Sequence, residues 1–281
     1  MEAKSMGNET QLLNPGNLYQ EALREHPEYG EISQNRIISL ISDTTSEIEH
    51  LERVGEKEKS RIVMSPEIAK NIAAIWIISG PGTYDLPAKD DKYKDFEWAW
   101  GMDRTRLNHG AFLARKIAEA RSGEDFSGGT FVDIKQRKQK IESMIKQFGP
   151  DIVYNGTQLE NDTVADVLTR EETIIPEEKV NIIGGDIKIT LDQVRTFQLP
   201  YELNENEELA IVSHAPQLAR IMHMINKYQP FQSGTKVRLF PVPTPESGKA
   251  EYAKMETLGL LRYVYLDGDA TEAGYPYALN T

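Results

Sequence analysis

The sequence predicts an α/β protein: a Rossmann-like three-layer α/β/α sandwich with a mostly parallel sheet and an N-terminal helical extension. Short continuous apolar runs alternate along the chain with longer segments whose apolar residues recur at helical spacing. A continuous apolar run is typical of a strand buried on both faces, and an intervening helix leads such strands into parallel pairing. Three of the runs also end in small polar turns, which is where open α/β sheets bind ligands.

The first 70 residues predict a helical extension, residues 1–70, that packs on a core domain of residues 71–281. Apolar residues such as Ile37 and Ile41 recur there at the spacing of a helix with one buried face. This segment is acidic, and the sequence does not say whether it serves as a lid, a dimer surface or a partner site.

The core domain is predicted to alternate strands with helices. The predicted strands are 72–79, 151–155, 179–183, 208–213 and 236–242, and the predicted helices are 103–121, 135–147, 160–172, 190–198, 215–228 and 247–261. Pro241 and Pro243 indicate that the last of these strands lies at an edge of the sheet or ends there. The tail, 265–281, is rich in turn residues and tyrosine, so we expect it either to stay loose or to fold back over the ligand site.

Composition restricts the function classes. The 281 residues carry a net charge of −12, which disfavours nucleic-acid binding, and the basic stretch 135–140 is interpreted as the solvated face of a helix. Because the chain has no cysteine, disulfides, thiolate metal sites and cysteine nucleophiles are excluded. No apolar run approaches the roughly 18 residues that span a membrane. The N-terminus lacks the pattern of a secretory signal, so we expect a cytoplasmic protein with no membrane partner.

The polar turns predict a ligand site. They are Ser79-Gly80, Asn155-Gly156 and Ser213-His214. Because the carboxyl ends of parallel strands share one edge of the sheet, these turns are expected to converge in a cleft. Gly80 and Gly82 either expose backbone amides to a phosphate-type anion or serve only to turn the chain.

Two arginines are candidates for holding an anion, because a guanidinium group binds phosphate bidentately. Arg106 lies early in the helix that follows the first strand, and Arg220 lies two turns into the helix that follows Ser213. The alternatives are a surface position for Arg106 and a salt bridge to an acid such as Asp192 for Arg220. The aromatic segment 83–102 predicts a long loop that either closes over a planar ligand or packs on the N-terminal helices.

His214 and Asp192 are the candidates for proton transfer. No set of His, Asp and Glu residues has metal-ligand spacing, so we predict no structural metal. A magnesium ion bridged by a substrate phosphate and an acid such as Asp85 or Asp192 is left open. For Ser213 the alternative to a ligand contact is a plain helix N-cap.

In their order these segments resemble the YdcF-like (also ElyC- or SanA-like) family over residues 72–243. The resemblance is carried by IISGPG (77–82), Arg106-Leu107, Asn155-Gly156, TIIPEEKV (173–180), ITLDQV (189–194) and VSHAPQLARI (212–221). Thr190 and Arg220 match family positions, whereas Gln217 replaces the family's histidine. The resemblance implies a Rossmann-like sandwich with a pocket above the strand ends, and it adds Thr190 and Gln217 to the expected ligand-binding residues. It also implies a small phosphate- or nucleotide-like ligand, and S-adenosylmethionine has been proposed for the family.

The sequence leaves two functions open. In the first, the protein binds and acts on a small anionic, nucleotide-like or phosphorylated ligand by hydrolysis or group transfer, with Arg106 and Arg220 on the anion. In the second, it binds S-adenosylmethionine or a nucleotide without catalysis, which the missing family histidine favours. A methyltransferase is disfavoured because no glycine-rich turn is followed by an acid at the end of the next strand. The cofactor stays open between S-adenosylmethionine and a magnesium–phosphate ligand, and a homo-oligomer is compatible with either function.

Overall fold

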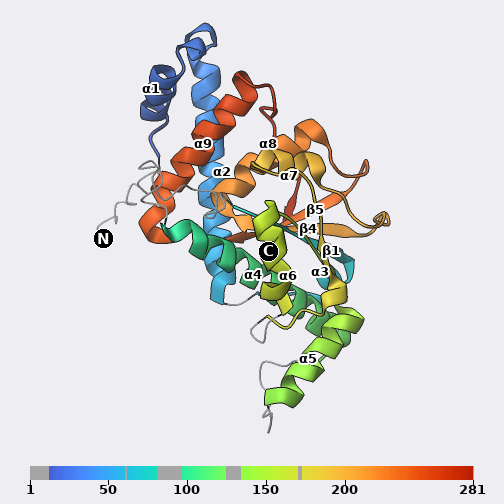
Figure 1. Cartoon of the computed structure of the whole chain (residues 1–281). Helices are drawn as coiled ribbons and strands as arrows, with labels where there is room; N and C mark the ends of the chain where they lie inside the picture. Colours follow the sequence, from blue (N-terminus) through green and yellow to red (C-terminus); the bar gives the residue numbers. More distant parts are fainter. Residues whose placement is uncertain (1–12, 61, 81–96, 125–133, 170–172, 281) are drawn as a thin grey trace, which may run out of the picture.

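The fold is built on a six-stranded sheet in which every strand pair is parallel (Figure 1). The computed structural model describes residues 13–60, 62–80, 97–124, 134–169 and 173–280. The strands are β1 (Ile72–Ile78), β2 (Asp151–Asn155), β3 (Val180–Ile182), β4 (Glu208–His214), β5 (Lys236–Val242) and β6 (Ala278–Leu279). Their order in the sheet, β3-β2-β1-β4-β5-β6, is that of a Rossmann fold. The predicted fold class is therefore confirmed.

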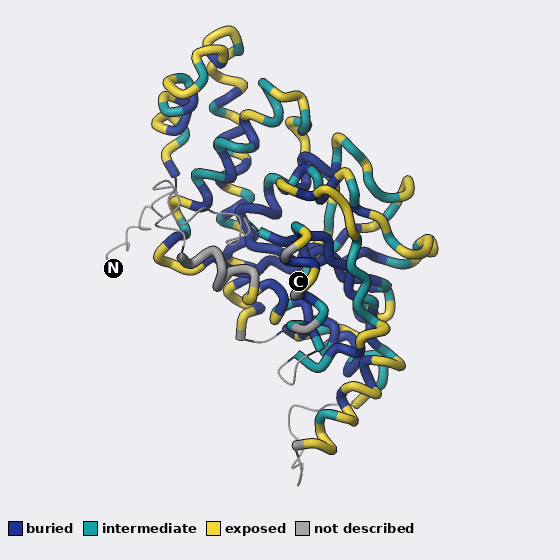
Figure 2. The backbone as a smooth tube through the Cα atoms, viewed as in Figure 1, coloured by how far each residue is buried: buried dark blue, intermediate teal, exposed yellow. Residues whose placement is uncertain are grey.

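Helices cover both faces of the sheet. The helices are α1 (Pro15–Glu25), α2 (Gln34–Ser60), α3 (Pro66–Asn71), α4 (Glu97–Ser122), α5 (Ile134–Phe148), α6 (Gln158–Thr169), α7 (Thr190–Thr196), α8 (Ala215–Tyr228) and α9 (Lys249–Tyr265). Buried side chains of α3, α4, α5 and α6 pack on one face, and those of α1, α2, α7, α8 and α9 pack on the other. These layers on either side of the sheet form the three-layer sandwich (Figure 1), and the buried stretches of the chain lie at its centre (Figure 2).

The central strands are apolar throughout because both of their faces are buried. In β1, Trp76 and Ile78 belong to the core shared with α8 and α9, whereas Ile75 and Ile77 belong to the core shared with α4. Alternate side chains of a strand point to opposite faces, so a strand covered on both sides needs apolar residues at every position. This is why the continuous run in the sequence predicted the strand correctly.

The strand order creates a switch point between β1 and β4. The chain leaves β1 toward β2 on one side and later returns to β4 on the other side of β1. Connections that diverge in this way leave a crevice outside the carboxyl ends of the two strands, where ligands bind in open α/β sheets. The residues that follow Ile78 and end β4 are therefore the first place to look for a site.

The N-terminal helices are part of the layer that covers the sheet. The 27-residue helix α2 contacts α8, α9 and β5 (Figure 1). At Gly55 it comes so close to β5 that an added Cβ would lie 2.7 Å from the backbone oxygen of Pro241. One turn earlier, the Glu52 carboxylate accepts hydrogen bonds from the backbone amide of Thr244. Both contacts hold α2 beside the carboxyl end of β5.

The C-terminal tail folds back along α8 and extends the sheet. The amide of Thr271 donates to the carbonyl of His223, and the amide of Tyr275 donates to that of Met222. The tail then forms β6, which pairs with β5 only at Arg238 and Leu239. Of the two alternatives for this strand, the edge position is wrong, because β6 is the edge strand, and the other is confirmed, because β5 ends at Val242, between Pro241 and Pro243. Pro241, which has no amide to donate, lies beyond the end of this pairing.

No helix within the described ranges is both long and apolar enough to cross a membrane.

Candidate functional site

A buried polar cluster lies at the switch point between β1 and β4. Ser79 and Gly80 follow β1, and Ser213 and His214 end β4. The two strands pair in parallel up to Ile77 and Val212, so their ends are level and the polar residues lie together. Ser79, Ser213 and His214 are all buried. A buried hydroxyl or imidazole is costly unless it has partners, so the contacts of this cluster decide its role.

Gln217 joins the ends of the two strands. It lies in the first turn of α8, and its Oε1 accepts a hydrogen bond of 2.5 Å from the Ser213 hydroxyl. Its Nε2 donates to the carbonyl oxygen of Ser79 at 2.9 Å and to the Thr190 hydroxyl at 3.5 Å. The structure thus brings Ser213, Gln217 and Thr190 together, as expected for the ligand-binding set. Their mutual bonds also fasten α7 and α8 to β1.

Gln193, one turn into α7, is a member of the cluster that the sequence did not single out. Its Nε2 donates to the Ser79 hydroxyl. Its Oε1 is buried and makes no hydrogen bond to any described residue. A buried acceptor without a partner is rare in a folded protein, because its desolvation is not offset. This oxygen is therefore positioned to accept a hydrogen bond from a ligand or a water molecule.

Asn155, at the end of β2, has a positioning role. Its Oδ1 accepts from the Trp76 indole at 2.8 Å, and its Nδ2 donates to the backbone oxygen of Gln193 at 2.7 Å. The next amide, that of Gly156, donates to Asn161 Oδ1 at 2.9 Å. These bonds tie the end of β2 to α7 and close the turn itself. The Asn155-Gly156 turn therefore lies beside the cluster. The Asn155 side chain and the Gly156 amide form hydrogen bonds to other residues of the protein.

Arg106 is buried at the end of β1. It is 1% exposed, and its Nη1 donates to the carbonyl oxygen of Ile78 at 3.2 Å. A Cβ added at Gly80 would lie only 2.1 Å from its Nη2. Glycine at position 80 is thus required for the guanidinium group to approach the backbone. The alternative of a surface arginine is wrong for this residue.

Arg220 is held by a carboxylate of α9. Its Nε lies 2.5 Å from Oε2 of Glu256, and its Nη2 donates to the Thr190 hydroxyl at 3.1 Å. The guanidinium group also lies over the ring of Tyr263, 5.6 Å from the centroid. The alternative of a salt bridge from Arg220 to a neighbouring acid is confirmed, but the acid is Glu256 and not Asp192.

Glu256 is a buried acid that faces two cations. Burial raises the pKa of its carboxyl group, whereas the nearby guanidinium groups of Arg220 and Arg106 oppose this rise. The sequence contains a pattern that indicates this residue. Tyr252, Glu256 and Leu260 are spaced four apart and all are buried, so an acid occupies the apolar stripe of α9. A charged residue in such a stripe marks a buried ion pair or a site.

The two candidates for proton transfer lie in different surroundings. The Asp192 carboxylate accepts hydrogen bonds from the backbone amides of Lys188 and Ile189, at 3.0 and 3.1 Å, and so caps the start of α7. His214 is fully buried, and its ring stands edge-on to that of Tyr252 with 6.3 Å between the centroids. Asp192 thus has a structural role as the cap of α7, whereas His214 lies inside the polar cluster.

Several expected site residues fall outside the described ranges. Gly82, Asp85 and the first part of the segment 83–102 lie there. The end of that segment is not a loop, because α4 begins at Glu97. On α4, His109 has a ring nitrogen, Nε2, that is buried and has no hydrogen-bond partner among the described residues. Burial lowers the pKa of His109 to about 4.

Comparisons with known proteins leave the family open. No protein-family model matches this chain, and neither does any curated protein or any solved structure. The resemblance to the YdcF-like family therefore stays a prediction. Within the described ranges, no group of three or more His, Asp or Glu residues is placed to hold a metal ion.

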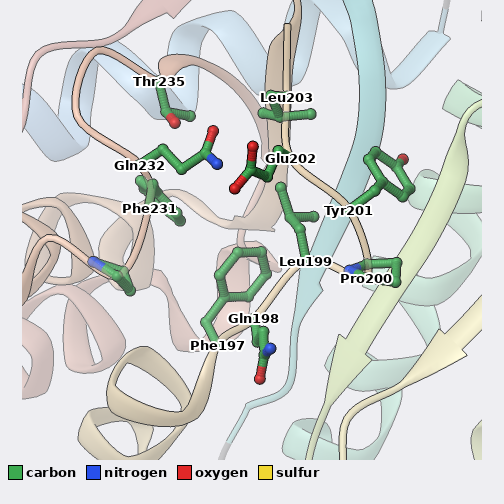
Figure 3. Close-up of a pocket in the computed structure, with 11 residues that line it drawn as sticks. Phe197, Gln198, Leu199, Pro200, Tyr201, Glu202, Leu203, Phe231, Gln232 and Thr235 are labelled. Atoms are coloured by element: carbon green, nitrogen blue, oxygen red, sulfur yellow. The ribbon is translucent and has the colours of Figure 1, made fainter.

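Two further cavities lie away from the cluster. One, of about 300 Å³, lies between the loop after α7 and the loop before β5 (Figure 3). The other, of about 160 Å³, is lined by residues of α4 and α5 together with Thr173 and Ile174. Neither cavity is lined by Ser79, Ser213 or Gln217. Among the described residues, the switch point brings together two guanidinium groups, the Glu256 carboxylate and an amide oxygen, Gln193 Oε1, that has no hydrogen-bond partner there.

Proposed function

We propose that this protein binds a small anionic ligand, nucleotide-like or phosphorylated, at the switch point between β1 and β4. The observation that carries the proposal is the convergence of Arg106 and Arg220, from two different helices, on the ends of these strands. Both guanidinium groups lie close enough to Glu256 to lower the pKa of its carboxyl group. Arg106 donates to the carbonyl oxygen of Ile78, and Arg220 shares the Thr190 hydroxyl with Gln217, whose amide donates to the next carbonyl, that of Ser79. These contacts bring both arginines to the same polar cluster.

Burial increases what these arginines contribute to binding. A guanidinium group presents a fork of donors that matches two phosphate oxygens, and the interaction is stronger where water is excluded. Arg220 is held by Glu256, Thr190 and Tyr263, so little freedom remains to be lost when a ligand binds. The unused Oε1 of Gln193 adds an acceptor suited to an amino or hydroxyl group of the same ligand.

Between a protein that only binds this ligand and an enzyme that acts on it, the geometry favours the binding protein. Turnover by hydrolysis or group transfer requires a group that moves a proton at the reacting atom. Asp192 is engaged in capping α7, and Gln217 stands where the family resemblance has a histidine. The second candidate function, an enzyme acting on the same ligand, is supported by the location of His214 at the end of β4. A nucleotide and a magnesium–phosphate ligand belong to the anionic class proposed. S-adenosylmethionine is nucleoside-like but has a net positive charge, so it would offer the two arginines only its carboxylate.

The experiment is a thermal-shift series with adenosine, ADP, S-adenosylmethionine and a sugar phosphate. A ligand at a hundredfold excess over its Kd stabilises the folded state by about 2.7 kcal/mol. For a chain of this size that raises the Tm by roughly 5–10 °C. We expect phosphorylated ligands to give such a shift and adenosine to give a smaller one.

Two variants locate the site. In the double variant Arg220→Met/Glu256→Met, both members of the buried ion pair are replaced by apolar residues, so that neither is left without the other. We expect this variant to fold and to lose the ligand-induced shift. Arg195→Gln is the control, because Arg195 lies on α7 in an exposed ion pair with Asp269. The proposal is wrong if no anion shifts the Tm of the unmodified protein, or if the double variant keeps the whole shift.

Whether the bound ligand is consumed distinguishes the enzyme from the non-catalytic binding protein. If the ligand identified in this way is consumed, and His214→Asn abolishes consumption while binding persists, the protein is an enzyme. A ligand that binds and is recovered unchanged supports the non-catalytic version.

A further inference from the structure

The 300 Å³ cavity lies at the opposite end of the sheet from the polar cluster. It is lined by residues 197–203, which follow α7, and by Pro230, Phe231, Gln232 and Thr235, which precede β5. Because α8 starts at the carboxyl end of β4 and ends at Tyr228, the segment before β5 is at the amino ends of the strands. The cavity is thus separate from the proposed anion site.

The apolar part of the cavity is a fixed aromatic surface. The ring of Phe197 packs on that of Trp76 with 4.0 Å between centroids, and Phe231 meets Phe197 edge-on at 5.4 Å. The ring of Tyr275 meets that of Phe231 edge-on, with 6.0 Å between centroids, and its hydroxyl donates to the backbone oxygen of Thr235. Aromatic rings held by one another in this way do not have to be ordered when a ligand binds.

The loop on the other side is also held in place. The Tyr201 hydroxyl points away from the cavity and donates to the carbonyl oxygen of Ala73 at 3.2 Å (Figure 3). The backbone amide of Asn204 is tied to the Glu207 carboxylate at 2.8 Å. Both walls are therefore preformed, as is usual for sites that bind small molecules.

One negative charge lies among the lining residues. Glu202 is the only lining residue with a charged side chain, and it makes no hydrogen bond or ion pair to any described residue. Figure 3 shows the Glu202 carboxylate and the Gln232 amide extending toward each other from the two loops, with the Phe197 ring on another side of the cavity. A carboxylate beside aromatic faces favours a cation, which both the charge and the ring quadrupoles attract.

We propose that this cavity is a second binding site, and that it takes a small organic cation that carries a flat ring and an ammonium group. The volume is at the lower end of the range for ligand pockets, about 300–1,000 Å³, which fits a single ring with a short arm. The ring packs on Phe197 and Phe231, and the ammonium group pairs with Glu202. The amide of Gln232 supplies a further hydrogen-bond acceptor.

The test is an NMR titration of the full chain with two probes of nearly the same shape. The cation is 2-phenylethylammonium and the anion is 3-phenylpropionate, both at millimolar concentrations and constant ionic strength. We expect the cation to give saturating shifts in the amide signals of residues 197–203 and 230–235. The anion is expected to bind at least about threefold more weakly, as is typical for one partly exposed charge pair.

Two matched variants assign the charge preference. Glu202→Gln keeps the size and hydrogen bonding of the side chain, and it is expected to weaken cation binding by about threefold while leaving anion binding unchanged or stronger. Glu205→Gln is the control, because Glu205 is an exposed acid of the same segment that does not line the cavity. Equal affinity for the two probes overturns the proposal. So does the absence of saturating shifts in these loops, or a cation affinity that Glu202→Gln leaves unchanged.

Discussion

Two buried titratable groups are expected to cancel each other's effect on stability between pH 4.5 and 6.5. The first is Glu58, near the end of α2, whose side chain accepts a hydrogen bond from Asn280 Nδ2 at 2.8 Å. Its other oxygen, Oε2, is buried and has no hydrogen-bond partner in the described part of the chain. Burial raises the pKa of Glu58 from 4.5 to about 7. The second group is His109, whose pKa burial lowers from 6.5 to about 4.

The two groups change stability in opposite directions as the pH rises. The folded state holds the Glu58 proton up to about pH 7, whereas the unfolded state releases it near 4.5, so this group destabilises the fold progressively between these values. For His109 the unfolded state takes up a proton below 6.5 and the folded state does not, so stability is lost as the pH falls from 6.5 to about 4. A pKa shift of one unit changes the free energy of unfolding by about 1.4 kcal/mol. The pKa of each group shifts by about 2.5, which therefore changes the free energy of unfolding by about 3 kcal/mol in total.

The perturbation is Glu58→Gln, which keeps the acceptor for Asn280 and removes the charge. We expect this variant to match the unmodified protein below pH 4.5 and to be more stable by about 3 kcal/mol at pH 8. His109→Gln should do the reverse, with little relative change at pH 8 and a relative gain of about 3 kcal/mol near pH 4. Glu56→Gln and His50→Gln are the controls, because both residues are exposed.

The assay is urea denaturation followed by circular dichroism, repeated at half-unit steps from pH 4 to pH 8.5. The difference in free energy of unfolding between variant and unmodified protein is plotted against pH, so that other titrating groups drop out. A difference for Glu58→Gln that is constant across this range would refute the reasoning for that residue. A constant difference for His109→Gln would refute it for the histidine.

Two further predictions concern the candidate site. Gly80→Ala brings a Cβ within 2.1 Å of the Arg106 guanidinium group, so we expect the group to move. Stability should then fall by about 1–3 kcal/mol and anion affinity should fall with it; a variant with unchanged affinity in calorimetry would show that Arg106 is not a ligand contact. Asp192→Ala removes the cap of α7 and is expected to cost about 1 kcal/mol in denaturant unfolding. Asp192→Asn, which keeps one acceptor oxygen, should recover part of that loss, and a cost shared equally by both variants would argue against the cap.

The sequence was sufficient for the fold because the core alternates simple patterns. Strands buried on both faces are apolar at every position, so β1, β2, β4 and β5 could be located to within a few residues. The helices between them carry one apolar stripe and could be located nearly as well, except that α4 begins at Glu97, six residues before its predicted start. The tail was undecided because β6 has only two residues and is held by side-chain and backbone bonds to α8 and α2. Contacts of this kind leave no periodic pattern in the sequence.

The site was predictable only in part, for a similar reason. Parallel pairing fixes where strand ends lie, so the turns at Ser79 and Ser213 could be placed together from their positions alone. The partner of Arg220 could not be predicted from the sequence, because Glu256 lies on α9, 36 residues further along the chain. The choice between Asp192 and Glu256 depends on how α7 and α9 pack against α8. Only the tertiary structure contains that information.

The short helix α7 connects the two proposed sites. Thr190 and Gln193 belong to the polar cluster at its start, and Phe197 follows its end and forms the aromatic surface of the second cavity. Seven helical residues span only about 10 Å, so a shift of α7 at one end displaces groups at both. The Asp192 cap fixes the start of this helix, and the bond from Asn155 to the Gln193 carbonyl holds it against β2. A ligand that repositions Gln193 would therefore act on Phe197 through a rigid element, and thermodynamic reciprocity requires that a ligand bound at Phe197 act equally on the cluster.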